Sequence, residues 1–127
     1  MTYHFSKTID VPFAQAVDRV TDALRAEGFG VLTDIDVAAT MKAKLGAEFR
    51  PYRILGACNP KLAYRALELE DKIGTMLPCN VIVQEHGGKV EVSAVDPAAS
   101  MQAIDNPMLA EVATEVRAKL KRVIDSL

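Results

Sequence analysis

The chain has 127 residues, 50% of them hydrophobic and 25% charged, which is the size and composition of one globular domain with a buried core. Its formal net charge is −2, so it offers no basic surface that would attract nucleic acid. Its apolar runs, such as Val81–Val83, are far too short to cross a membrane, and we treat residues 1–127 as a single domain.

The first quarter of the chain is predicted to form a strand, a helix and a second strand. Residues Tyr3–Ile9 alternate in polarity, as a half-buried strand does. Pro12 favours the first turn of a helix, whose apolar residues recur at helical spacing as far as Leu24. Gly28 is typical of the position that ends a helix, and Phe29–Ile35 is predicted to be the second strand.

A short helix, a third strand and another helix are expected next. Asp36 is a typical N-cap, and Gly46 ends the short helix that follows it. The segment Phe49–Cys58 is predicted to be a strand. Asn59-Pro60 combines an N-cap with a first-turn proline, so we expect a helix that extends through Leu69.

A β-hairpin is the clearest element of the sequence. After a loop at Gly74–Pro78, strands at Cys79–His86 and Lys89–Val95 are joined by the two-residue turn Gly87-Gly88. If His86 pairs with Lys89, one face of the hairpin is apolar and the other is mixed. The apolar face comprises Val81, Val83, Val90, Val92 and Ala94, and the mixed face comprises Ile82, Gln84, Glu91 and Ser93.

The chain is predicted to end in a loop, Asp96–Asp105, and a long helix that begins at Asn106-Pro107 and reaches Leu127. Five strands and two long amphipathic helices predict an α+β fold of two layers, an antiparallel sheet with helices packed on one face. A homodimer is the simplest way to cover the second face and to hide Ile82.

Cys58 and Cys79 lie at opposite ends of a strand–helix–strand connection. If the third and fourth strands are antiparallel neighbours, both cysteines lie at the same edge of the sheet. Their surroundings mirror each other, Cys58-Asn59-Pro60 against Pro78-Cys79-Asn80. Cys58 also precedes a helix N-terminus, whose partial positive charge favours the thiolate that acts as nucleophile or metal ligand. The two cysteines are therefore a candidate thiol site.

Core packing is the alternative, and it is the more common role of a free cysteine. Met76 or Met101 beside the cysteines would suit a soft ion such as Cu(I). The sequence has no Cys-x-x-Cys pair and no Cys/His cluster, so no metal site is assigned. A role for His4 or His86 in proton transfer stays open, and no catalytic motif assigns a reaction or a cofactor.

The cysteine content and the N-terminal residues favour the cytoplasm. Two cysteines do not make a disulfide framework, and reducing conditions are the default for such a chain. Residues 1–7 have no basic region followed by an apolar stretch, so no signal peptide is expected.

Two segments carry a resemblance to a known family, residues 52–60 (YRILGACNP) and residues 76–83 (MLPCNVIV). Together with the helix that ends in Gly28-Phe29 and the double-glycine hairpin, they resemble the domain-of-unknown-function 302 family over nearly the whole chain. The resemblance implies a TATA-binding-protein-like α+β fold with a curved sheet, and a dimer, but it implies neither DNA binding nor any activity. The positions that match the family's motif are Cys58, Asn59, Pro60, Pro78, Cys79 and Asn80.

The sequence thus predicts a small cytoplasmic binding or interaction module, homodimeric, with a ligand cleft near Cys58 and Cys79. The alternative is a thiol-based protein that carries sulfur, senses redox state or handles a soft metal through the same two residues. The expected partners are a second copy and a small-molecule, sulfur or metal ligand, with no nucleic acid and no membrane.

Overall fold

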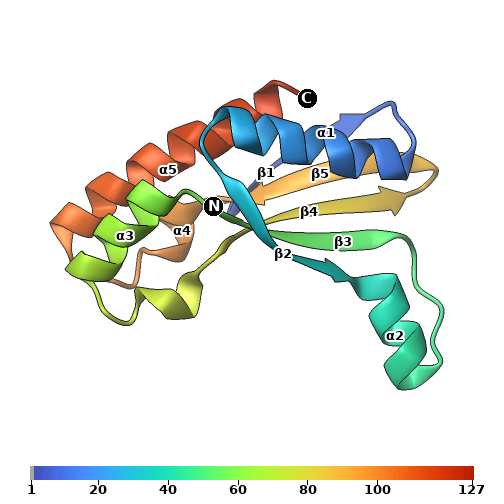
Figure 1. The fold of residues 1–127 in the computed structure, drawn as a ribbon, viewed down its shortest axis with the longest axis horizontal. Helices are drawn as coiled ribbons and strands as arrows, with labels where there is room; N and C mark the ends of the chain where they lie inside the picture. Colours follow the sequence, from blue (N-terminus) through green and yellow to red (C-terminus); the bar gives the residue numbers. More distant parts are fainter. Residues whose placement is uncertain (1) are drawn as a thin grey trace.

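The computed structural model describes residues 2–127 and contains one five-stranded sheet, in which every neighbouring pair of strands is antiparallel (Figure 1). The strand order is β1-β5-β4-β3-β2. The strands are β1 (His4–Ile9), β2 (Gly30–Asp36), β3 (Tyr52–Cys58), β4 (Cys79–His86) and β5 (Lys89–Val95).

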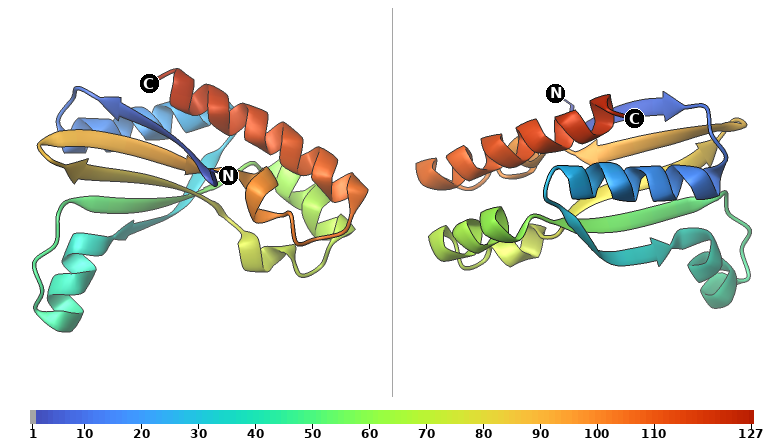
Figure 2. Two further views of the ribbon diagram at one scale, coloured as in Figure 1. Left: turned by 180° about the vertical axis from the view of Figure 1, so that it is seen from behind. Right: turned by 45° about the horizontal axis from the view of Figure 1, so that its top comes forward.

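The long helices lie on one side of this sheet, as Figures 1 and 2 show. They are α1 (Phe13–Ala26) and α5 (Pro107–Asp125), and α5 extends past the end of the sheet, where α3 (Pro60–Leu69) and the one-turn helix α4 (Pro97–Ser100) lie beside it. Helix α2 (Val37–Leu45) instead projects from the β2–β3 side, away from the helix layer, and buries no residue. No helix within residues 2–127 is long and apolar enough to cross a membrane.

The α+β fold and the helices on one face are confirmed. The expected strands Tyr3–Ile9 and Phe29–Ile35 are His4–Ile9 and Gly30–Asp36, and the last helix ends at Asp125 rather than Leu127. Three segments differ more. The strand expected from Phe49 begins at Tyr52. The loop expected at Gly74–Pro78 overlaps a 3₁₀ turn, Ile73–Met76. The loop expected at Asp96–Asp105 contains α4, because the Asp96 carboxylate accepts a hydrogen bond from the Ala98 N–H (3.0 Å) and caps the helix.

The main core lies between the sheet and helices α1 and α5. The hairpin turns at Gly87-Gly88, both with positive φ, and His86 pairs with Lys89 as expected. This register places the apolar face of the hairpin against the helices, and that face is buried. The helices contribute Ala16, Val20, Leu24, Leu120, Val123 and Ile124.

A second apolar cluster lies beyond the end of the sheet, between α3, the 3₁₀ turn and α5. Its buried members are Leu62, Ala66, Ile73, Leu109 and Val112. The chain therefore has two adjacent cores, and the space between them is where the candidate site is found.

The opposite face of the sheet, which α1, α3 and α5 leave uncovered, carries a row of three isoleucines. The strand register pairs Ile35 with Ile54, and Ile54 with Ile82. Ser93 continues the row, and its hydroxyl is 2.7 Å from that of Ser6. We call Ile35, Ile54 and Ile82 the isoleucine row.

The two histidines are at opposite ends of the sheet. His4 pairs with Val95 at one end, and its Nδ1 is 2.8 Å from the Ser6 hydroxyl. His86 pairs with Lys89 at the hairpin turn, at the other end. The two histidines therefore do not form one proton-transfer pair.

Candidate functional site

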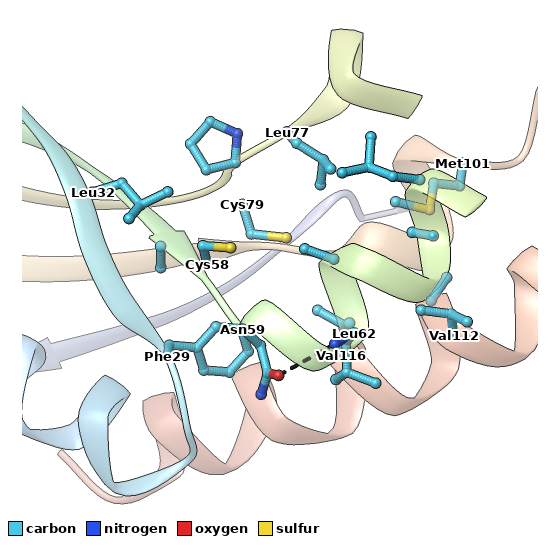
Figure 3. Close-up of a pocket in the computed structure, with 16 residues that line it drawn as sticks. Phe29, Leu32, Cys58, Asn59, Leu62, Leu77, Cys79, Met101, Val112 and Val116 are labelled. Carbon is cyan, nitrogen blue, oxygen red and sulfur yellow. Dashed lines mark hydrogen bonds between the residues drawn. The ribbon is translucent and has the colours of Figure 1, made fainter. Parts of the chain in front are cut away.

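A cavity of about 260 Å³ lies between the two apolar cores, bounded by the ends of β3 and β4 and by helices α3 and α5 (Figure 3). Its outer rim includes Leu32 and Leu67, which are 67% and 45% exposed, so the cavity opens to solvent there. The lining is otherwise formed by Phe29, Ala57, Cys58, Asn59, Leu62, Ala63, Ala66, Leu77, Pro78, Cys79, Met101, Val112, Ala113 and Val116. We call this space the apolar cavity.

Strand register brings the two cysteines together. Cys79 lies opposite Ala57 in the β3–β4 ladder, and Cys58 is the next residue along β3. Both side chains line the apolar cavity, as Figure 3 shows. Cys58 is half-buried, whereas Cys79 is buried, and neither is in a disulfide.

Burial and, to a smaller extent, the neighbouring Cys58 together raise the pKa of the Cys79 thiol to about 11. Cys79 is therefore a neutral thiol at physiological pH. As a free group it is not a nucleophile there, because the thiolate is the reactive form.

Asn59 builds the wall of the cavity at the start of α3. Its Oδ1 accepts a hydrogen bond from the Leu62 N–H (3.4 Å), which caps the helix, and its Nδ2 donates to the carbonyl of Glu27 (3.4 Å). The second bond connects α3 to the end of α1. Gly28 packs so closely here, with φ of +86°, that a Cβ atom on it would lie 3.1 Å from Asn59 Nδ2.

Four of the six motif residues line the apolar cavity, and two do not. Pro78 joins Cys58, Asn59 and Cys79, and follows a cis Leu77–Pro78 peptide bond. Pro60 instead occupies the exposed first turn of α3, where it borders a separate cleft with Lys61 and Lys119. Asn80 is exposed and pairs with Gly56 in the β3–β4 ladder.

Much of the cavity was not assigned from the sequence. Leu32 lies where the β2–β3 register shifts between Val31 and Thr33, an irregularity that directs a large apolar side chain to the rim. Of the two methionines considered beside the cysteines, Met101 lines the cavity from the end of α4, whereas Met76 is exposed and is not part of the lining. The one signal in the sequence is the small size of lining residues on the facing helices, alanines at positions 63, 66 and 113, which leave room rather than fill it.

The lining contains no Asp, Glu, Lys, Arg or His. Its only polar side chains are the two thiols and the Asn59 amide, and that amide already has two backbone partners. Across residues 2–127, no group of three or more His, Cys, Asp and Glu side chains is arranged to hold a metal ion. The cavity can therefore accept uncharged apolar groups, or chemistry that uses sulfur alone.

Comparison with known proteins places these features in a family. The family model described as "Domain of unknown function DUF302" matches residues 5–127. The crystal structure of an uncharacterized conserved protein DUF302 from Bacillus stearothermophilus matches with a TM-score of 0.92 and 28% sequence identity, covering 98% of each chain. No curated protein matches the chain. The likeness to a TATA-binding-protein-like fold stays a prediction.

Proposed function

The chain belongs to the DUF302 family, a domain of unknown function, and from its own geometry we propose that it is a binding module whose apolar cavity takes a small uncharged ligand beside Cys58 and Cys79. The observation that carries this proposal is a solvent-connected cavity without a charged side chain in its lining. Protein cores are normally packed to leave few voids larger than a water molecule, so an open space of this size needs a reason.

The size of the cavity limits the ligand. Its volume of about 260 Å³ exceeds the ~150 Å³ engineered cavity that binds benzene, and it lies just below the ~300–1,000 Å³ of pockets for larger ligands. A ligand with one substituted ring or a short hydrocarbon chain fits these limits. Affinity would come from burying apolar surface, since the lining offers almost no free hydrogen-bonding group.

A series of straight-chain alcohols tests this proposal. Each added methylene that enters an apolar site contributes about 0.8 kcal/mol, or roughly a fourfold gain in affinity. We expect affinity, measured by calorimetry or by the rise in melting temperature, to increase with chain length and then level off when the cavity is full. Affinity that is undetectable at every length, or that rises without levelling off, would contradict the proposal.

The module is proposed to act as a homodimer through the uncovered sheet face. The isoleucine row lies on that face, and Ile35 is 47% exposed. A second copy is the fitting occupant because a two-fold axis pairs the same stripe with itself, and the face offers few charges that would select another partner. Light scattering should give a solution mass near twice the chain's 13.8 kDa; a mass of one chain at high concentration would contradict the dimer.

A second candidate function is thiol chemistry, favoured by the shared location of Cys58 and Cys79 on one cavity wall. In this alternative the cavity admits a sulfur-containing or soft-metal cargo. Because burial holds Cys79 protonated, the chemistry would depend on a cargo that displaces the proton.

We place the module in the cytoplasm, and we propose that residues 1–127 act as one domain. Two unpaired cysteines support a reducing compartment. A net charge of −2 argues against nucleic acid as a partner.

A further inference from the structure

We propose that Cys58 and Cys79 form a two-coordinate site for a soft monovalent metal ion, Cu(I), at the wall of the apolar cavity. The inference rests on the proposed function in one respect, since the cavity must admit a ligand from solvent. It goes further by naming the ion, the two donor atoms and the kind of metal that the site rejects.

The donor set is the first argument. Two sulfur atoms from neighbouring strands line one wall, where the β3–β4 ladder ends: Cys79 is in its last pair, and Cys58 lies one residue beyond that pair. The other lining side chains are hydrocarbon, apart from the Met101 thioether and the engaged Asn59 amide. Thiolates without oxygen or imidazole donors select soft ions such as Cu(I) over Mg²⁺, Ca²⁺ or Mn²⁺.

Coordination number separates Cu(I) from zinc. Structural Zn²⁺ sites are almost always tetrahedral and use four Cys, His or carboxylate ligands. Within residues 2–127 no cluster of even three such groups is found, so a zinc site cannot be completed there by protein ligands. Cu(I) is stable with two thiolates, and two thiols are what this wall provides.

The charge of the complex can be accommodated. Binding replaces two S–H bonds by two S–Cu bonds and releases two protons to solvent, with no change in oxidation state, so a neutral pair of thiols and Cu(I) become a complex of charge −1. This charge forms next to the N-terminus of α3, since Cys58 directly precedes the N-cap Asn59. The partial positive charge of a helix N-terminus stabilises a neighbouring anion.

The test is a competition titration of the whole chain, under anaerobic conditions, against the chromogenic Cu(I) chelator bicinchoninate. We expect the wild type to withdraw one equivalent of Cu(I). The Cys58→Ser and Cys79→Ser variants should lose affinity by more than the roughly 10–100-fold that removal of an outer-shell group costs. Met101→Leu is the matched control, because it removes a sulfur from the same cavity but keeps its shape, and it should bind as the wild type does.

Three results would overturn the inference: a wild type that withdraws no Cu(I), a Cys58→Ser/Cys79→Ser variant that withdraws as much as the wild type, or displacement of the bound Cu(I) by equimolar Zn²⁺. Circular dichroism checks that each variant is folded. Cys79→Ala replaces Cys79→Ser if a buried hydroxyl prevents folding. Alcohol binding measured on the same samples distinguishes the Cu(I) site from the apolar ligand site. If the wild type binds alcohols normally but does not bind Cu(I), only the metal site is rejected.

Discussion

Cys58 and Cys79 belong to neighbouring antiparallel strands and line the same cavity wall, although they are separated by a helix and a 3₁₀ turn in the sequence. The strand that ends at Cys58 and the strand that begins at Cys79 meet at one end of the sheet. Helix α3, which follows β3, lies beyond that end and forms one side of the cavity (Figure 3). Four of the six motif residues, Cys58, Asn59, Pro78 and Cys79, thus line one cavity through the return of the chain.

The raised pKa of Cys79 predicts a loss of stability at high pH. The folded thiol keeps its proton up to about pH 11, whereas the ordinary value is 9.0, so the unfolded chain loses this proton first. The contribution of this thiol to the free energy of unfolding is complete below about pH 9. It declines by on the order of 2 kcal/mol as the pH rises toward 11. Urea unfolding at about pH 8 and about pH 10.5 measures this decline in the free energy of unfolding.

The matched variant for this experiment is Cys79→Ser. It has no thiol at this position, so its stability should fall less than that of the wild type between the two pH values. Other titrating groups contribute equally to both proteins and cancel in the difference. An equal fall in the free energy of unfolding of the two proteins would show that burial does not raise the pKa of Cys79.

Replacing Asn59 by alanine should destabilise the protein by about 1 kcal/mol, within the ~0.5–2 kcal/mol typical of a lost N-cap. The change removes the cap on Leu62 N–H and the bond to the Glu27 carbonyl. Asn80→Ala is the control, because Asn80 is exposed and should change stability by less than ~0.5 kcal/mol. Urea unfolding compares the two, and equal effects would contradict the role of Asn59.

Gly56→Ala should be destabilising by about 1–3 kcal/mol, as overpacked core substitutions are. An added Cβ would overlap the Thr33 hydroxyl and come within 2.7 Å of Pro78 Cγ. Gly30→Ala is the control on a neighbouring strand, since nothing lies within 4 Å of a Cβ there. In a Thr33→Ala background, Gly56→Ala should lower the free energy of unfolding by less, because the overlapping hydroxyl is gone. An unchanged loss would show that contact with Thr33 is not the cause.

Ile82→Lys should convert the proposed dimer to monomer. The substitution places a charge at one end of the isoleucine row, on the central strand β4, where a second copy would have to desolvate it. Gln15→Lys is the control, because it adds the same charge to an exposed position of α1, on the other side of the sheet. Light scattering measures both, and a dimer that persists in Ile82→Lys would reject this face as the interface.

Local signals explain why most of the fold could be predicted. Gly87-Gly88 sets the hairpin register, and both residues adopt the positive φ that this turn requires. Asn59-Pro60 and Asn106-Pro107 mark helix starts, because each pair supplies a cap and a first-turn proline. The short helix α4 was missed because four residues are too few to display helical periodicity.

The cavity could be predicted only in part, because it is a gap in packing rather than a motif. The position of the cysteines follows from strand order, which the sequence pattern indicates. The volume of the cavity depends on the spacing between helices α3 and α5, and on the register shift that places Leu32 at the rim. Neither is determined by residues that are close together in the sequence.

Blocking the cavity is the most direct test of the central claim, that this space binds a small apolar ligand. Ala63 is half-buried in the lining, so Ala63→Phe adds a ring to the cavity, whereas Ala118→Phe adds the same ring to an exposed position of α5. Calorimetric titration with 1-hexanol, a short-chain ligand within the size limit of the cavity, should give saturable one-site binding to wild type and Ala118→Phe. Affinity for Ala63→Phe should be at least about tenfold weaker, a loss of ~1.4 kcal/mol. Equal binding to all three proteins would contradict the claim.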